Sequence, residues 1–160
     1  MTAPSPTPVA ELTHYQSPLP FEHERIGAAA VYCSDGRYGE QMDDFLHTHL
    51  RLPHYDRVAM PGGCAALASH FVTMREEMAL DRQLRFLIAS HKLHTVVLIA
   101  HQDCGYYKQI RLRHKTLEAQ QFDDLKRSAD RIRTFAPELT VVAYMAHKNG
   151  DQVCFDPVAV

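Results

Sequence analysis

The sequence predicts an α/β domain in which a mostly parallel four-stranded sheet is flanked by helices and carries an antiparallel edge strand. Apolar runs at 27–33 and 95–100, rich in alanine and β-branched residues, are typical of strands buried on both faces of a parallel sheet. Stretches of helical periodicity alternate with these runs, which favours parallel strands joined by crossover helices. Near the carboxyl end, Asn149-Gly150 is a two-residue hairpin signal, so we expect the last strand to return antiparallel.

The remaining elements follow from apolar spacing and from the residues that interrupt it. The second strand is short, because Pro61-Gly62-Gly63 stops it. The predicted strands are 27–33, 57–60, 95–100 and 139–145 with an edge strand at 153–155, and the predicted helices are 40–50, 65–91 in one or two pieces, 105–115 and 117–134. Within 65–91 the apolar residues at helical spacing are Met74, Met78, Leu84, Leu87 and Ile88.

Length, composition and charge limit the class of protein. The chain has 160 residues, of which 46% are hydrophobic, and this suits one compact domain. We assign that domain to residues 26–160 and interpret the proline-rich residues 1–25 as an arm on the domain or a partner, or as a partly disordered tail. The net charge of −2 and the pI of about 6.6 give no electrostatic footprint for nucleic acid or an anionic membrane.

The same features bear on location. No apolar run approaches the roughly 20 residues of a membrane span, and the N-terminus lacks the basic and apolar regions of a signal peptide. We therefore expect a cytoplasmic protein, in which thiols stay reduced and the four cysteines form no disulfides.

Soft metal ligands follow two of the predicted strands. Cys33-Ser34-Asp35-Gly36-Arg37 begins at the last residue of the first, and His101-Gln102-Asp103-Cys104-Gly105 comes directly after the third. In α/β sheets the site lies beyond the carboxyl ends of strands, where the strand order reverses. If these two strands are neighbours there, Cys33, His101 and Cys104 converge. Two thiolates and one imidazole make a three-ligand zinc site with a fourth position for water or substrate.

Asp35 and Arg37 extend the predicted site beyond the metal ligands. Asp35 lies two residues after Cys33 and can point at the same ion. It either takes the fourth zinc position, or accepts a hydrogen bond from a zinc-bound water while Arg37 holds it away from the metal in a bidentate pair. In the second case zinc acidifies its water and generates hydroxide.

Together, the two motifs resemble the signatures of the β-class carbonic anhydrases, Cys-x-Asp-x-Arg followed some tens of residues later by His-x-x-Cys. The resemblance covers roughly residues 27–145. It implies reversible hydration of carbon dioxide to bicarbonate by a zinc-bound hydroxide, and a homodimer or larger homo-oligomer. The site residues that it implies are Cys33, His101 and Cys104 as zinc ligands and Asp35 with Arg37 as the catalytic dyad.

One segment departs from the family pattern. After the second strand the family usually carries Arg-Asn-Ala-Gly-Asn, whereas this chain has Ala59-Met60-Pro61-Gly62-Gly63. Gln16 and Gln41 are weak candidates for the family's substrate-binding glutamine. Three alternatives therefore stay open: hydrolysis of carbonyl sulfide or carbon disulfide at the same site, a non-catalytic zinc protein with Asp35 as fourth ligand, and a thiol-based redox protein.

The other cysteines and histidines have simpler interpretations. Cys64 is a small core residue at a helix start, a supplementary metal ligand or a thiol lining the pocket, and Cys154 is edge-strand filling. His47, His49 and His54 follow no metal-ligand template, so we interpret them as solvated or capping residues.

Overall fold

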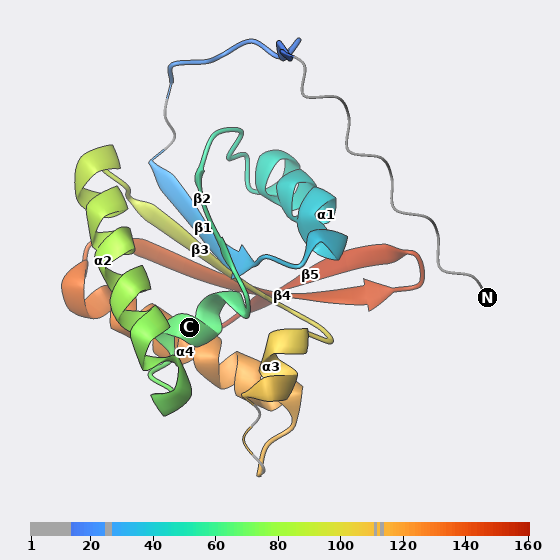
Figure 1. Ribbon diagram of the computed structural model, residues 1–160, viewed down its shortest axis with the longest axis vertical. Helices are drawn as coiled ribbons and strands as arrows, with labels where there is room; N and C mark the ends of the chain where they lie inside the picture. The colour runs from blue at the N-terminus through green and yellow to red at the C-terminus, as the bar shows by residue number, and fades with distance from the viewer. Residues whose placement is uncertain (1–13, 25–26, 111, 113) are drawn as a thin grey trace.

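A five-stranded sheet with the order β2-β1-β3-β4-β5 forms the centre of the computed structural model, which describes residues 14–24, 27–110, 112 and 114–160 (Figure 1). The strands are β1 (Ala28–Cys33), β2 (Asp56–Met60), β3 (Thr95–His101), β4 (Thr140–Asn149) and β5 (Gln152–Val158). The first four run parallel, and β5 pairs antiparallel with β4 at the edge. The fold class predicted from the sequence is confirmed.

Helices cover both faces of the sheet, so the domain has three layers. The longer helical segments are α1 (Gly39–Asp44), which continues into a π-helical turn at Phe45–His49, α2 (Met74–His91) and α4 (Leu117–Phe135). α1 lies on one face, and α2 and α4 lie on the other (Figure 1). Along β1, Ala29 and Val31 pack toward α2 and α4, whereas Ala30 and Tyr32 pack toward α1. Burial on both faces explains why the first apolar run does not alternate with polar residues.

The region predicted as a helix over 65–91 is helical in several pieces. Two 3₁₀ segments, η3 (Gly63–Leu67) and η4 (Phe71–Thr73), precede α2. In α2 the buried leucines are Leu80 and Leu84, while Met78 is 70% exposed. At 3.6 residues per turn, Met78 lies about 200° around the helix from Leu80. The apolar spacing that includes Met78 therefore predicted the helix correctly, but Met78 does not lie on the buried face.

The helix that follows the second motif is shorter than predicted. α3 covers only Gly105–Gln109, against the predicted 105–115. The side chain of Gln120 in α4 accepts a hydrogen bond from the backbone N–H of Leu112 at 2.8 Å and donates one to the carbonyl of Ile110 at 3.3 Å. These backbone groups are therefore held by α4 and do not continue α3.

The predicted hairpin is present, with its turn moved by one residue. Asn149 pairs with Gln152 as the last pair of β4 and β5. The two-residue loop is therefore 150–151, and Gly150 has a positive φ of 61°, as the turns of tight hairpins require.

The N-terminal arm predicted over 1–25 is described in part. Residues 14–24 are exposed, and Glu22 contacts the domain through an ion pair with His54, with Nε2 and Oε2 2.6 Å apart. Residues 1–13 and 25 of the arm lie outside the described residues. Across the described ranges, no helix combines the length and the apolar character that a membrane span needs.

Candidate metal centre

The two motifs meet because β1 and β3 are adjacent parallel strands. Cys33 is the last residue of β1 and His101 is the last residue of β3. The strand order reverses at this point, since β1 leads to β2 on one side and pairs with β3 on the other. A tight turn in which Asp103 has a φ of +58° then brings Cys104 to the start of α3.

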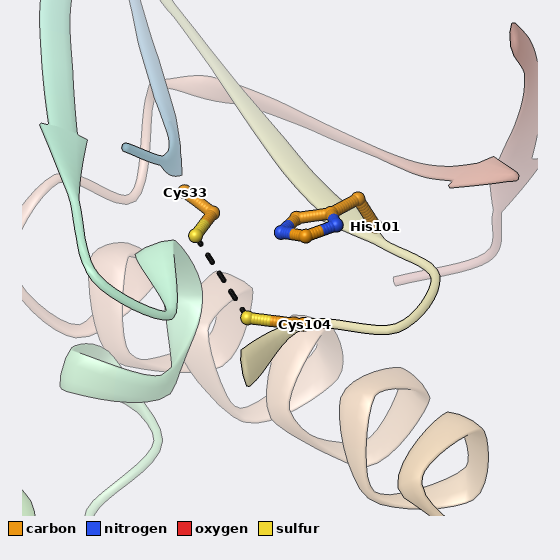
Figure 2. Close-up of side chains that lie close together, drawn as sticks. All are labelled: Cys33, His101 and Cys104. Carbon is orange, nitrogen blue, oxygen red and sulfur yellow. Dashed lines mark hydrogen bonds between the residues drawn. The ribbon is translucent and has the colours of Figure 1, made fainter. Parts of the chain in front are cut away.

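The three predicted ligands converge on one point (Figure 2). The sulfurs of Cys33 and Cys104 are 3.8 Å apart, and the ligand atoms of these two residues and His101 all lie within 4.8 Å of one another. The side chains are nearly inaccessible, with exposed fractions of 8% for Cys33, 2% for Cys104 and 1% for His101. Two zinc–sulfur bonds of about 2.3 Å at a tetrahedral angle separate the sulfurs by about 3.8 Å. The spacing of the thiols therefore suits zinc.

The imidazole of His101 is oriented as a metal ligand. Its Nδ1–H donates to the backbone carbonyl of Gln102 at 2.8 Å, which leaves the lone pair on Nε2. Nε2 is buried and has no hydrogen-bond partner among the described residues. Buried polar atoms are almost always paired, and a ring nitrogen whose opposite N–H is fixed by a carbonyl is the usual form of a metal-bound histidine. The residues present thus fit a zinc ion.

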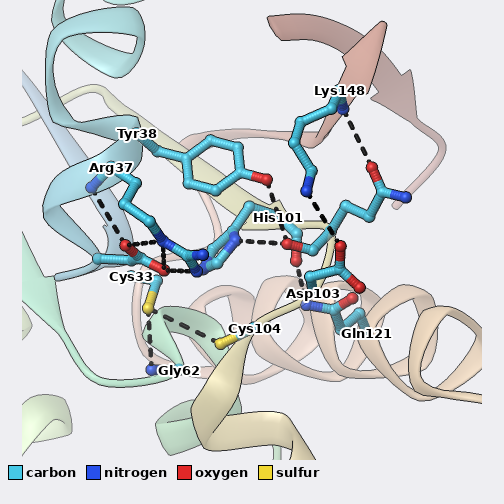
Figure 3. A network of polar contacts seen from close by, with 11 residues as sticks. Cys33, Arg37, Tyr38, Gly62, His101, Asp103, Cys104, Gln121 and Lys148 are labelled. Carbon is cyan, nitrogen blue, oxygen red and sulfur yellow. Dashed lines mark hydrogen bonds and ion pairs between the residues drawn. The ribbon is translucent and has the colours of Figure 1, made fainter. Parts of the chain in front are cut away.

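The two thiols are hydrogen-bonded to each other. The hydrogen bond from Cys33 lowers the pKa of Cys104 to about 6, and the backbone N–H groups of Tyr106 and Tyr107 act in the same direction. The same hydrogen bond, together with burial, raises the pKa of Cys33 to about 12. The side chain of His101 and the N–H of Gly62, which lies 3.4 Å from the Cys33 sulfur (Figure 3), oppose this rise. Cys104 therefore loses its proton more readily than Cys33, and binding of a divalent metal to both sulfurs would displace the remaining thiol proton.

Asp35 and Arg37 form the bidentate pair that the sequence allows. The Arg37 guanidinium donates to Asp35 at 2.9 Å from Nε and 2.6 Å from Nη2, and the Arg37 backbone N–H donates at 3.1 Å. These bonds lower the pKa of Asp35 to about 2 and raise that of Arg37. The Asp35 side chain is 19% exposed and that of Arg37 is 68% exposed. Asp35 does not belong to the close group of metal-ligating atoms, and no second group of three occurs among the described residues.

The glycine turn after β2 lies directly against the site. Gly62 and Gly63 both have positive φ, 75° and 50°. A Cβ on Gly62 would lie 2.3 Å from the ring of Tyr106, and one on Gly63 would lie 2.8 Å from the backbone nitrogen of Cys33. The segment that departs from the family pattern therefore approaches the site with its backbone and presents no polar side chain at these two positions.

The remaining sequence predictions have mixed outcomes. Cys64 is 1% exposed and packs in the core, with its thiol 3.7 Å from the carbonyl of Val31, so the core interpretation is confirmed. All four cysteines are free thiols, as expected. Gln16 and Gln41 are both exposed. His47, His49 and His54 belong to no metal-ligating group among the described residues.

Three polar residues around the site lie outside the set predicted as site residues. Tyr38 packs its ring 4.4 Å from that of His101 and donates its hydroxyl to the Gln102 carbonyl at 3.2 Å. Gln121, buried in α4, donates to the carbonyl of His101 at 2.8 Å. Tyr38 follows the first motif and Gln102 lies within the second, so their positions in the sequence could have pointed to them, whereas nothing in the sequence marks Gln121.

Known proteins place the chain in a family. A sequence profile described as "Putative carbonic anhydrase" matches residues 23–155. The chain belongs to this family. No curated protein matches it in sequence.

Solved structures of carbonic anhydrases share the fold of this family member at low sequence identity. The β-carbonic anhydrase isoform I of Trichomonas vaginalis has a TM-score of 0.53 at 12% identity, over 84% of each chain. The β-carbonic anhydrase CcaA has a TM-score of 0.54 at 13% identity, over 83% of each chain. The β-carbonic anhydrase CafA of Aspergillus fumigatus has a TM-score of 0.51 at 13% identity, over 84% of this chain and 76% of that one. These similarities show the shared fold alone.

Proposed function

We propose that the protein is a zinc-dependent lyase that reversibly hydrates carbon dioxide to bicarbonate. Family membership supports this activity. The observation that carries the proposal is the unpaired, buried Nε2 of His101, which lies within 4.8 Å of the thiol sulfurs of Cys33 and Cys104. Burying an imidazole nitrogen without a hydrogen-bond partner is costly. A metal ion between Nε2 and the two sulfurs would bind all three atoms and remove this cost.

In this proposal each residue has a separate role. Cys33, His101 and Cys104 would hold the ion, which when bound would supply a Lewis acid that lowers the pKa of a water molecule. Asp35 accepts a hydrogen bond from the attacking water. Because its pKa is about 2, Asp35 stays ionised and orients the water without storing its proton. Arg37 holds the Asp35 carboxylate in the bidentate pair and so would keep it from acting as a further metal ligand.

The direct test is stopped-flow hydration of carbon dioxide by zinc-loaded protein at pH 8–9. We expect a hydration rate above that of buffer. Cys104→Ser should lose both this activity and the bound zinc. Cys64→Ala is the matched control, because Cys64 is buried in the core and lies outside the ligand group; it should keep its zinc and its rate. Activity of the wild-type protein no greater than buffer would refute the proposal.

A second substrate class is compatible with the same residues. The ligand side chains are at most 8% exposed, which favours a small linear molecule, and Gly62 and Gly63 offer no side chain that could hydrogen-bond a polar substrate. Carbonyl sulfide and carbon disulfide meet both conditions. Hydrogen sulfide release from either, at a rate above that for carbon dioxide, would assign the protein to these substrates.

A non-catalytic zinc site with Asp35 as fourth ligand is the competing interpretation. The pair between Asp35 and Arg37 argues against it, since both carboxylate oxygens accept hydrogen bonds from the guanidinium. X-ray absorption of the zinc protein separates the two cases. If the fourth zinc ligand is an oxygen atom that bromide does not replace, and if it stays bound when Arg37 is mutated, the site is the non-catalytic one.

We also propose that the domain, residues 26–160, works in the cytoplasm as a homodimer or larger homo-oligomer. Large apolar side chains stand exposed at the start of α2 and just before it, with exposed fractions of 88% for Phe71, 66% for Val72 and 70% for Met78. Exposed apolar groups of this kind mark protein interfaces. Analytical ultracentrifugation should give at least twice the monomer mass, and Phe71→Glu should shift the mass toward that of the monomer.

A further inference from the structure

Helix α4 carries an unusual set of buried polar side chains. They are Gln120, Gln121, Asp124 and Ser128, with exposed fractions between 0% and 3%. A helix normally presents apolar residues to the core, and burying an amide or a hydroxyl is costly unless it is hydrogen-bonded. Ser128 bonds the carbonyl of Cys64 at 2.8 Å, just after the glycine turn. Asp124 pairs with His70 at 2.7 Å.

The two glutamines hold the chain on either side of Cys104. Gln121 donates from Nε2 to the backbone carbonyl of His101 at 2.8 Å. Gln120 binds the backbone of Ile110 and Leu112, just beyond the end of α3. Of the two, only Gln121 bonds a predicted zinc ligand.

The peptide unit that follows His101 is fixed at both of its polar groups. Its carbonyl accepts from Gln121, and its N–H, on Gln102, donates to the carbonyl of Ala146 in β4 at 2.8 Å. The next carbonyl, that of Gln102, then accepts from Nδ1 of His101 and from the hydroxyl of Tyr38. A rotation of the first peptide would therefore move the acceptor that orients the imidazole.

We propose that Gln121 is a positioning residue for the metal centre, which fixes the His101–Gln102 peptide and thereby aims Nε2 of His101 at the two thiols. This inference rests on the proposed zinc function. It concerns the orientation of a ligand through its own backbone, and the partner comes from a helix that contributes no ligand. The hydrogen-bonding partners of metal ligands typically change metal affinity by about 10–100-fold.

The test compares Gln121→Met with Gln120→Met. Both replacements keep an unbranched side chain of similar length and remove buried amide hydrogen bonds, and the two residues are equally buried. The zinc dissociation constant, measured by competition with a chromophoric chelator, should rise about tenfold in Gln121→Met and less than threefold in Gln120→Met. The ligand-field bands of the cobalt-substituted protein should shift in Gln121→Met alone, which a general loss of stability would not produce.

A second variant and a wild-type measurement keep the test decisive. Gln121→Glu preserves length but its carboxylate cannot donate to a carbonyl, so it should weaken zinc binding at least as much as the methionine. In the wild-type protein, zinc should shift the side-chain amide NMR signals of Gln121 more than those of Gln120, because coupling between sites is reciprocal.

The possible failures are distinguishable. If wild-type protein binds zinc and the Gln121 and Gln120 variants match it in affinity and cobalt spectrum, the positioning role is wrong and the proposed function stands. If wild-type protein binds zinc without hydrating carbon dioxide, the lyase proposal fails and the positioning role is still decided by the affinities. If wild-type protein binds neither zinc nor cobalt, both are overturned.

Discussion

Gly63 lies where the turn after β2 crosses the end of β1, and replacing it by alanine measures how closely the two segments approach. A Cβ there would lie 2.7 Å from the carbonyl carbon of Tyr32 and 2.8 Å from the nitrogen of Cys33. Both are backbone atoms of a central strand, so neither can rotate away, and forcing such an overlap costs about 1–3 kcal/mol. The φ of +50° adds about 1–2 kcal/mol for any residue with a Cβ. We therefore expect Gly63→Ala to lose about 3 kcal/mol of unfolding free energy.

Urea and thermal unfolding followed by circular dichroism measure this loss. For a chain of this length, about 3 kcal/mol corresponds to a fall of about 6–12 °C in Tm. Gly39→Ala is the control, because Gly39 has a helical φ of −57° and nothing within 4 Å of its would-be Cβ; it should be neutral or stabilising by up to about 1 kcal/mol. If Gly63→Ala were as stable as Gly39→Ala, the close approach of the turn to β1 would be wrong.

Three further predictions concern the metal and the buried charges. Removing zinc with a chelator should lower Tm in calorimetry, since at a free zinc concentration 1,000 times Kd the bound ion contributes about 4 kcal/mol; an unchanged Tm would argue against a structural link between β1 and β3. Arg37→Met should raise the pKa of Asp35 from about 2 toward its ordinary value, as followed by carboxyl carbon NMR. The lowered pKa of Asp35 stabilises the fold above pH 4 and ceases to do so as the pH falls toward 2. Any difference in unfolding free energy between Arg37→Met and wild type should therefore vanish near pH 2, and a difference that persists there would contradict the prediction. His70→Ala should lower the unfolding free energy by about 3–5 kcal/mol at pH 8, because the Asp124 carboxylate stays buried without its partner. The loss should be smaller at pH 4, because burial raises the pKa of Asp124 and so favours its neutral form. Equal losses in urea unfolding at pH 4 and pH 8 would refute this prediction.

The parts of the fold that could be predicted are those encoded locally. β1 and β3 were predictable because strands buried on both faces are continuously apolar. The three candidate ligands were predictable because cysteine and histidine at strand ends carry a specific chemistry. Their convergence followed once β1 and β3 were taken as neighbours, which the strand order confirms.

The parts that could not be predicted depend on contacts between distant segments. Gln121 looks like an ordinary solvent-exposed helix residue in the sequence, yet it is 3% exposed and bonds the carbonyl of His101, 20 positions away. Met78 has helical spacing with its apolar neighbours, but the position of α2 against the sheet puts it in solvent. The turn of the last hairpin was displaced by one residue because β4 pairs with β5 through Asn149.

The exposure of Arg37 has a consequence for how solution conditions reach the site. The metal ligands are almost inaccessible, whereas the guanidinium that holds Asp35 is 68% exposed. Exposed ion pairs are screened by dissolved salt, over a Debye length of about 8 Å at 0.15 M ionic strength. Added salt and small anions would therefore meet this guanidinium first. A rise in ionic strength would weaken the ion pair between Arg37 and Asp35, whose carboxylate orients the water, and would leave the thiol and imidazole ligands unchanged.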